Sequence, residues 1–160
     1  MNGVIEHFDS EAGYRAAIAR TLAGAQREIH IFDRDLLRMG FDEIAQVELL
    51  NRFLSTSTLS QLHVVVHDVA PLQSRLPRLL SLLRDHAHHV EVRQTPEHLR
   101  HLADCWVLAE QGNGTIRFHV DHARGKLVTA MPAELEPWWQ RASDLWNESA
   151  PCTPWATAGL

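Results

Sequence analysis

The amino-acid sequence predicts an α/β domain with a mixed, mainly parallel sheet flanked by helices. Segments with helical periodicity alternate with short runs of β-branched residues through the first part of the chain. This alternation is typical of parallel strands joined by right-handed crossovers. A glycine-rich turn at residues 111–114 lies between two further strand-like runs and predicts an antiparallel hairpin, which makes the sheet mixed.

The first part of the chain contains helix–strand pairs. Asp9 or Ser10 can cap the first helix and Asp42 the second, because short polar side chains accept hydrogen bonds from the free N–H groups at a helix start. A third helix begins with Pro77 in its first turn, where proline is tolerated. The strands that follow these helices are expected at residues 27–33, 62–68 and 90–93.

The second part of the chain contains the hairpin, an edge strand and a final helix. The hairpin strands are expected at residues 105–110 and 115–120, and the edge strand at residues 126–129. Pro132 starts a helix in which tryptophans and leucines recur on one broad face. This pattern favours packing of the helix against the sheet over a stacking platform for a ligand.

Length and composition predict one globular domain and limit its partners. The chain has 160 residues, 45% hydrophobic and 22% charged, and we expect a domain over residues 1–150 with a flexible tail over residues 151–160. The formal net charge of −5 disfavours nucleic acid and anionic lipid as partners. No apolar stretch approaches the ~20 residues that span a bilayer. The N-terminus lacks the features of a signal peptide, so a cytoplasmic location is expected.

Neither the cysteines nor the histidines follow a metal-binding pattern. Cys105 and Cys152 are far apart in the sequence and predict two reduced thiols. His86, His88 and His89 fall where a helix ends and a strand begins, a position that favours solvated histidines without any metal. We therefore expect no metal and no other cofactor.

Three stretches in this order resemble the phospholipase D-like superfamily over residues 27–149. They are the strand pair that ends in Asp33 and Asp68, the segment His89–Arg93 leading to Trp106–Glu110, and the aromatic helix over residues 139–149. The chain is most similar to a little-characterised bacterial branch whose members often follow GNAT-type acetyltransferase domains. The resemblance implies a phospholipase D-like fold.

The superfamily's catalytic signature, His-x-Lys-x4-Asp, is absent from the sequence. The chemistry needs an imidazole to attack phosphorus and a lysine to neutralise the phosphoryl oxygens. With Glu110 at the aspartate position, Ala103 and Cys105 stand at the histidine and lysine positions. His67, His101 and His119 each lack a lysine two residues further on. We therefore predict no catalytic residues of this class.

Polar residues at the expected strand ends predict a ligand pocket. Ligands collect at the carboxyl ends of parallel strands in open α/β sheets. The alternative is structural, because acidic residues at strand ends often cap the next helix, as Asp68 could do before Pro71. The candidate pocket residues are Asp33, Arg34, His67, Asp68, His98, His101 and Glu110.

These observations predict a non-catalytic binding or regulatory module whose ligand the sequence does not name. From the resemblance, it is expected to assist an acetyltransferase or another protein partner, and we also expect a homodimer through the sheet edge or the aromatic helix. The alternative function is a diverged phosphodiesterase or hydrolase that uses Asp33, His67, Asp68 and His101 in new roles.

Overall fold

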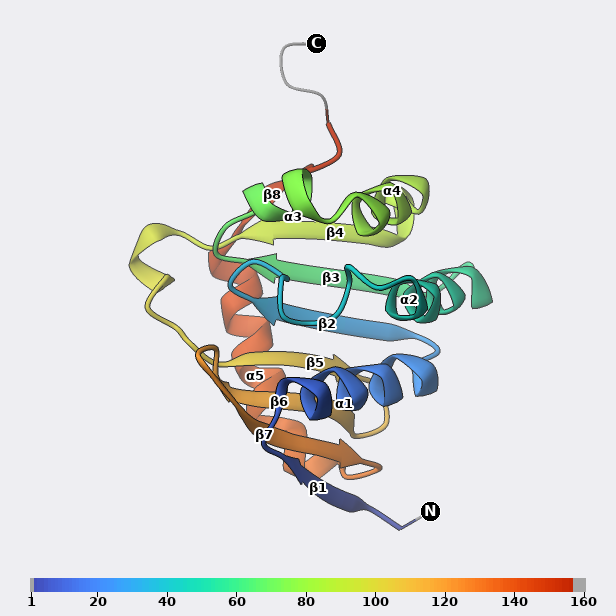
Figure 1. The fold of residues 1–160 in the computed structure, drawn as a ribbon, viewed down its shortest axis with the longest axis vertical. Helices are drawn as coiled ribbons and strands as arrows, with labels where there is room; N and C mark the ends of the chain where they lie inside the picture. The colour runs from blue at the N-terminus through green and yellow to red at the C-terminus, as the bar shows by residue number, and fades with distance from the viewer. Residues whose placement is uncertain (1, 157–160) are drawn as a thin grey trace.

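The computed structural model describes residues 2–156, which form one sheet with helices on both faces (Figure 1). Within these residues there are eight strands and five α-helices. In chain order they are β1 (Val4–Phe8), α1 (Glu11–Gly24), β2 (Glu28–Asp33), α2 (Ile44–Thr56), β3 (Gln61–Val66), α3 (Ala70–Arg75), α4 (Pro77–Asp85), β4 (Val90–Gln94), β5 (Cys105–Ala109), β6 (Asn113–His119), β7 (His122–Thr129), α5 (Pro132–Glu148) and β8 (Ala150–Cys152).

The sheet is mixed, but the prediction of a mainly parallel sheet is wrong. The strand order is β1-β7-β6-β5-β2-β3-β4-β8, and only β2-β3 and β3-β4 are parallel pairs. The chain leaves β4 through residues 95–104, which we call the 95–104 connection, and this segment stays at the end of the sheet where β4 finishes (Figure 1). The chain therefore re-enters the sheet from that end, and β5 runs antiparallel to β2.

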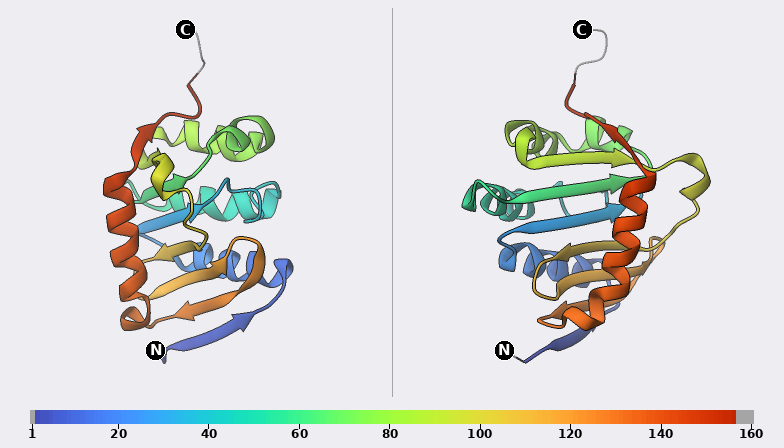
Figure 2. Two further views of the ribbon diagram at one scale, coloured as in Figure 1. Left: turned by 90° about the vertical axis from the view of Figure 1, so that its left-hand side faces the viewer. Right: turned by 180° about the vertical axis from the view of Figure 1, so that it is seen from behind.

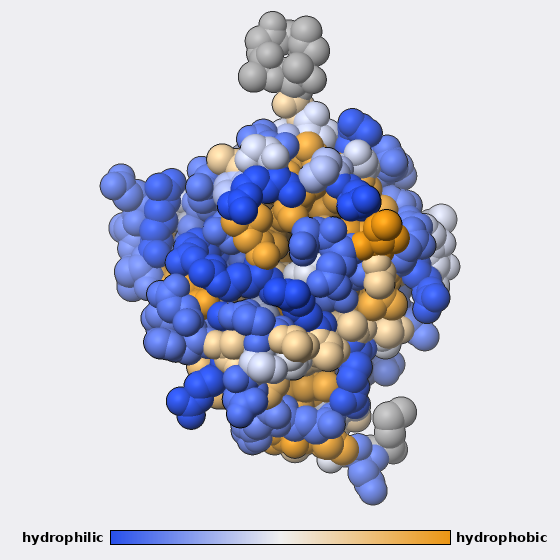
Figure 3. Space-filling view, viewed as in Figure 1, coloured by the Kyte–Doolittle hydropathy of each residue, from blue (hydrophilic) through white to orange (hydrophobic). Residues whose placement is uncertain are grey.

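Helices cover both faces of the sheet unequally. Helices α1 to α4 lie on one face and α5 crosses the other (Figure 2). A large core between α1–α4 and the sheet includes Tyr14, Phe53 and Leu83, and a smaller core under α5 includes Trp106 and Leu135. The face that carries α1 to α4 is largely hydrophilic, with apolar atoms visible between the helices (Figure 3). None of the helices formed by residues 2–156 has the length and apolar character needed to cross a bilayer.

The β5–β6 hairpin forms at the predicted place. The turn uses positive φ angles at Gln111 (64°) and Gly112 (75°), and Asn113 is already the first residue of β6. A Cβ on Gly112 would lie 2.3 Å from the backbone nitrogen of Pro132, and this contact excludes any other residue. The glycine thus brings the start of α5 against the hairpin.

The two edges of the sheet contain strands that the sequence analysis did not predict. Strand β1 pairs with β7, and β8 pairs with the end of β4. Strand β8 lies in the sheet and the Gln73 side chain donates a hydrogen bond to the Pro154 carbonyl (2.9 Å), so residues 151–154 of the expected tail contact the rest of the domain. Residues 157–160 of that tail lie outside the described residues.

Candidate functional site

A pocket of about 220 Å³ opens at the carboxyl ends of β2 and β3. Its lining includes Arg34, His67, residues 100–104 of the 95–104 connection, Cys105 at the start of β5, and residues 119–121 at the β6–β7 turn. The parallel register of β2 and β3 places Arg34 beside His67, and the Arg34 carbonyl accepts hydrogen bonds from the N–H groups of His67 (3.1 Å) and Asp68 (3.0 Å). We call this the strand-end pocket.

His67 is buried in the pocket wall and both of its ring nitrogens are occupied. Its Nε2 lies 2.7 Å from the Leu102 carbonyl oxygen, which can only accept, so Nε2 carries the proton. Its Nδ1 lies 2.6 Å from the Thr95 hydroxyl, which in this tautomer donates to it. The imidazole therefore ties the 95–104 connection to the end of β3 and has no free lone pair for a substrate.

His101 is exposed at the pocket rim. Its Nδ1 donates a hydrogen bond to the His98 carbonyl oxygen (3.0 Å), and its Nε2 has no hydrogen-bond partner among residues 2–156. His98 supplies this carbonyl, but its side chain does not line the pocket. The pocket thus joins Arg34, His67 and His101, as expected, but not His98.

Asp33 points away from the pocket. Successive side chains of a strand face opposite sides, so Asp33 shares with Ile29 and Ile31 the face that packs against α1 and α2. Its buried carboxylate accepts hydrogen bonds from the N–H groups of Leu36 (2.7 Å) and Asp35 (3.3 Å). It therefore holds the loop after β2, including the positive φ of Leu36 (68°).

Asp68 and Glu110 also lie outside the pocket lining. Asp68 accepts a hydrogen bond from the Ala70 N–H (3.0 Å) and so supports the start of α3. Because β5 is antiparallel to β2, Glu110 lies at the amino end of β2, opposite the pocket. There its carboxylate accepts hydrogen bonds from the N–H groups of Gln26, Arg27 and Glu28 at 2.8–3.2 Å. The expectation that Glu110 joins the polar cleft depended on the wrong strand direction.

Charged groups of both signs surround the strand-end pocket. Arg34 lies 3.5 Å from the Asp121 carboxylate and 3.7 Å from the Asp35 carboxylate. Arg141 donates two hydrogen bonds to the Asp104 carboxylate, at 2.6 and 2.8 Å. Arg100 has no ion-pair partner within the part of the chain that the structure describes. Sequence reasoning missed the contribution of the β6–β7 turn, because only the strand order brings that turn to this end of the sheet.

Ala103 and Cys105 also line the pocket. Burial raises the pKa of the Cys105 thiol, and the nearby Asp33 carboxylate raises it further. The thiol therefore stays protonated and is a poor nucleophile. The pocket wall at these two positions is a methyl group and an inert thiol.

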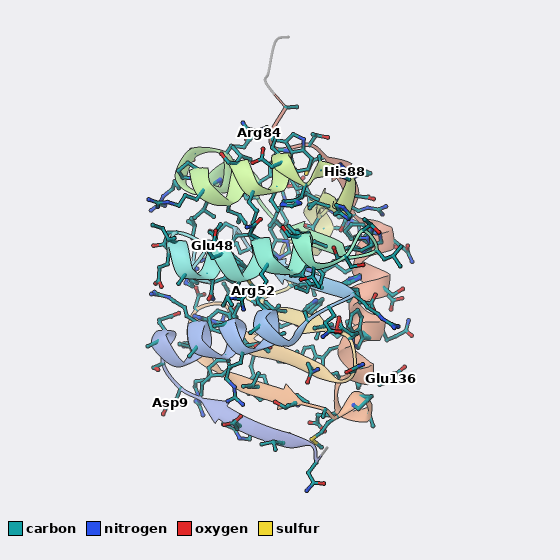
Figure 4. All side chains as sticks on the ribbon, turned by 90° about the vertical axis from the view of Figure 1, so that its right-hand side faces the viewer. Asp9, Glu48, Arg52, Arg84, His88 and Glu136 are labelled. Carbon is teal, nitrogen blue, oxygen red and sulfur yellow. The ribbon has the colours of Figure 1, made fainter. Side chains whose placement is uncertain are left out.

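Two of the three histidines after α4 have hydrogen-bond partners within the protein. His86 Nε2 lies 3.2 Å from the Asn51 Oδ1 atom, and His89 Nδ1 lies 2.9 Å from the Ser60 carbonyl. His88 is exposed beside the end of α4 (Figure 4). Across residues 2–156, no group of three or more His, Cys, Asp or Glu side chains is placed to hold a metal ion.

The domain has a phospholipase D-like fold, as its likeness to two solved structures shows. The phospholipase D family member Nuc from Salmonella typhimurium has a similar structure, with a TM-score of 0.66, 12% identity, and coverage of 94% of this chain and 99% of that chain. NucT from Helicobacter pylori has a TM-score of 0.57, 7% identity, and coverage of 94% and 100%.

The chain belongs to the family described as Domain of unknown function (DUF7931), which matches residues 10–156. TrmBL2, an archaeal chromatin protein with a novel mode of DNA binding, is also similar in structure, with a TM-score of 0.65 and 8% identity. The match covers 92% of this chain and 54% of TrmBL2. No curated protein matches the sequence. At these identities the structural likenesses establish the fold alone.

Proposed function

We propose that this domain is a non-catalytic phospholipase D-like module that binds a small anionic group, such as phosphate, in the strand-end pocket. The observation that carries the proposal is that Ala103 and Cys105 line this pocket. They stand at the catalytic histidine and lysine positions when Glu110 is aligned with the superfamily's aspartate. A phosphodiester in the pocket would meet no nucleophile at these two positions. Two cations line the pocket and can pair with an anion: Arg100, which has no ion-pair partner within residues 2–156, and Arg34, which would share its charge between the anion and Asp121 (3.5 Å).

Binding is tested by NMR titration of the purified protein with inorganic phosphate and pyrophosphate. We expect shifts confined to residues around the pocket and binding weakened several-fold by Arg34→Gln and by Arg100→Gln. The matched control is Arg52→Gln, since Arg52 is exposed on α2 (Figure 4) and remote from the pocket lining. Shifts that survive both pocket substitutions, or are absent in the unsubstituted protein, refute the proposal.

A diverged hydrolase is the second candidate function, because His67 and His101 line the same pocket. The two occupied nitrogens of His67 argue against it, and the unpartnered Nε2 of His101 argues for it. The discriminating assay is hydrolysis of bis-p-nitrophenyl phosphate and of single-stranded DNA, with and without a chelator. We expect no turnover. Metal-independent turnover that His101→Ala abolishes would establish the hydrolase instead.

Nucleic acid as a ligand is tested separately. DNA binding is described for TrmBL2, whereas the net charge of −5 of this chain opposes the approach of a polyanion. We expect no gel shift at low salt in the presence of heparin, and a shift that persists would favour a nucleic-acid adaptor.

We propose a homodimer through the β1 edge and, from the resemblance, assistance to an acetyltransferase. Val4 and Ile5 of β1 are 45% and 36% exposed on an unpaired sheet edge. The opposite edge is blunted, because β8 is only three residues long and contains Pro151. Co-purification with an acetyltransferase after joint expression tests the second partner.

A further inference from the structure

A second pocket, of about 180 Å³, lies between α5 and the 95–104 connection. Its walls are apolar and come from Leu99, Leu102, Trp106 and Leu145. Trp106 and Leu145 are buried in the core beneath α5. The volume is close to the ~150 Å³ of an apolar cavity that holds benzene, so the pocket fits one ring or a short aliphatic chain. We call it the α5 pocket.

The rim of the α5 pocket is negatively charged. Arg141, Asp144 and Glu148 follow one another along α5 at helical spacing and line the opening. The charge of Arg141 is already neutralised by Asp104, which receives two of its hydrogen bonds at 2.6 and 2.8 Å.

The two carboxylates of the rim are not neutralised in this way. Asp144 accepts a hydrogen bond only from the neutral Gln140 amide (3.2 Å), and Glu148 has no hydrogen-bond or ion-pair partner within residues 2–156. An apolar hollow of ring size thus lies directly beside two unneutralised negative charges.

We propose that the α5 pocket binds a small organic ammonium ion. The apolar body of the ligand lies against Trp106 and the leucines, and its ammonium group lies between Asp144 and Glu148 at the rim. A neutral molecule of the same shape gains only the apolar contact, and a carboxylate is repelled by the rim. The pocket is smaller than the ~300–1,000 Å³ of typical drug-sized ligand sites, which restricts the ligand to a single ring or short chain.

This site is distinct from the strand-end pocket, although the 95–104 connection borders both. Leu102 lines both pockets, and its carbonyl is held by His67. Asp104 lines the strand-end pocket and binds Arg141 at the rim of the α5 pocket. The proposal does not depend on anion binding, because the two ligands contact different side chains.

The test uses three probes of similar shape: 2-phenylethylammonium, 2-phenylethanol and 3-phenylpropionate. Each is titrated into the full-length protein and followed by NMR shifts of Leu99, Leu102, Leu145 and the Trp106 indole N–H. We expect the ammonium ion to bind about five-fold more tightly than the alcohol, since exposed ion pairs contribute up to about that factor each. The propionate should bind more weakly still.

Three substitutions assign the site. Asp144→Asn and Glu148→Gln should each weaken ammonium binding about two- to five-fold and leave 2-phenylethanol binding unchanged. The control is Glu136→Gln, because Glu136 is exposed near the other end of α5 (Figure 4) and should have no effect. Equal affinity for the ammonium ion and the alcohol, shifts that map away from the α5 pocket, or no binding of any probe at ~10 mM would each overturn the proposal.

Discussion

Acid should destabilise this protein through a pair of histidines beneath α5. His30 and His63 are neighbours in the parallel register of β2 and β3, with ring centroids 4.7 Å apart. The ring of His63 stacks on Trp146 at 4.3 Å, and the Arg93 guanidinium lies 4.1 Å from the same indole. Among residues 2–156, the buried Nδ1 of His63 has no hydrogen-bond partner.

Burial lowers the pKa of His30 from 6.5 to about 4, and the neighbouring His63 lowers it further. Burial also lowers the pKa of His63, with Arg93 contributing in the same direction and Glu91 in the opposite one. Protonation of either ring would place a cation beside the other ring and beside Arg93. The native state therefore keeps both imidazoles neutral under conditions in which exposed histidines are charged.

The direction of the pH effect follows from the difference between the pKa of His30 in the native protein and in the unfolded chain. Above pH 6.5 His30 is neutral in both the native and the unfolded chain, so it makes no difference to stability. As the pH falls below 6.5, the unfolded chain binds a proton that the native protein does not, and stability is lost until the pH reaches about 4. At 1.36 kcal/mol per pKa unit, His30 alone accounts for up to about 2.5 kcal/mol at pH 4.5.

The assay is urea unfolding at pH 7.0, 6.0, 5.0 and 4.5, followed by far-UV circular dichroism, for the unsubstituted protein and for His30→Phe. Phenylalanine keeps a ring against Trp139, which lies 5.0 Å from the His30 ring, but it cannot titrate. We expect the variant to gain stability relative to the parent by about 2 kcal/mol between pH 7.0 and 4.5. His88→Gln, at an exposed histidine, is the control. A difference between parent and His30→Phe that does not change with pH would refute the reasoning.

Three further substitutions test contacts elsewhere in the fold. Glu110→Ala leaves three backbone N–H groups without their acceptor and should lower the free energy of unfolding by about 1–3 kcal/mol, with phosphate binding unchanged, as measured by urea titration and NMR. Glu11→Gln should lower it by about 1–3 kcal/mol, because the guanidinium of the buried Arg117 loses the carboxylate that accepts two of its hydrogen bonds, and Glu11→Asp should restore part of the loss. Ile5→Lys should convert the proposed β1-edge dimer into a monomer in light scattering without changing the unfolding midpoint of the monomer, and a parent protein that is already monomeric would contradict this interface.

Much of the fold followed from periodicity, but the strand directions after β4 did not. The parallel strands β2 to β4 were predictable because strands covered on both faces have nearly continuous apolar runs. The 95–104 connection contained a signal that the prediction did not use. Parallel strands need a crossover of about a dozen residues or more, usually helical, and this connection is shorter and has no helical periodicity. Antiparallel entry of β5 was the simpler solution.

The site was predictable only in part, for related reasons. Arg34, His67 and His101 were found because they follow strands or lie in the loop beside them. Asp33 was placed wrongly, although its even spacing from Ile29 and Ile31 put it on the helix-covered face. His119 and Asp121 of the β6–β7 turn were beyond sequence reasoning, because their place beside Arg34 depends on the strand order.

The 95–104 connection lines both the strand-end pocket and the α5 pocket. Binding in one pocket is therefore expected to affect binding in the other. Leu102 lines both pockets, and Asp104 of the strand-end pocket holds Arg141 at the rim of the α5 pocket. If an ammonium ligand in the α5 pocket changes the affinity for phosphate by some factor, thermodynamic linkage requires phosphate to change the affinity for that ammonium ligand by the same factor. If both proposed ligands bind, the occupancy of one pocket would in this way change the occupancy of the other.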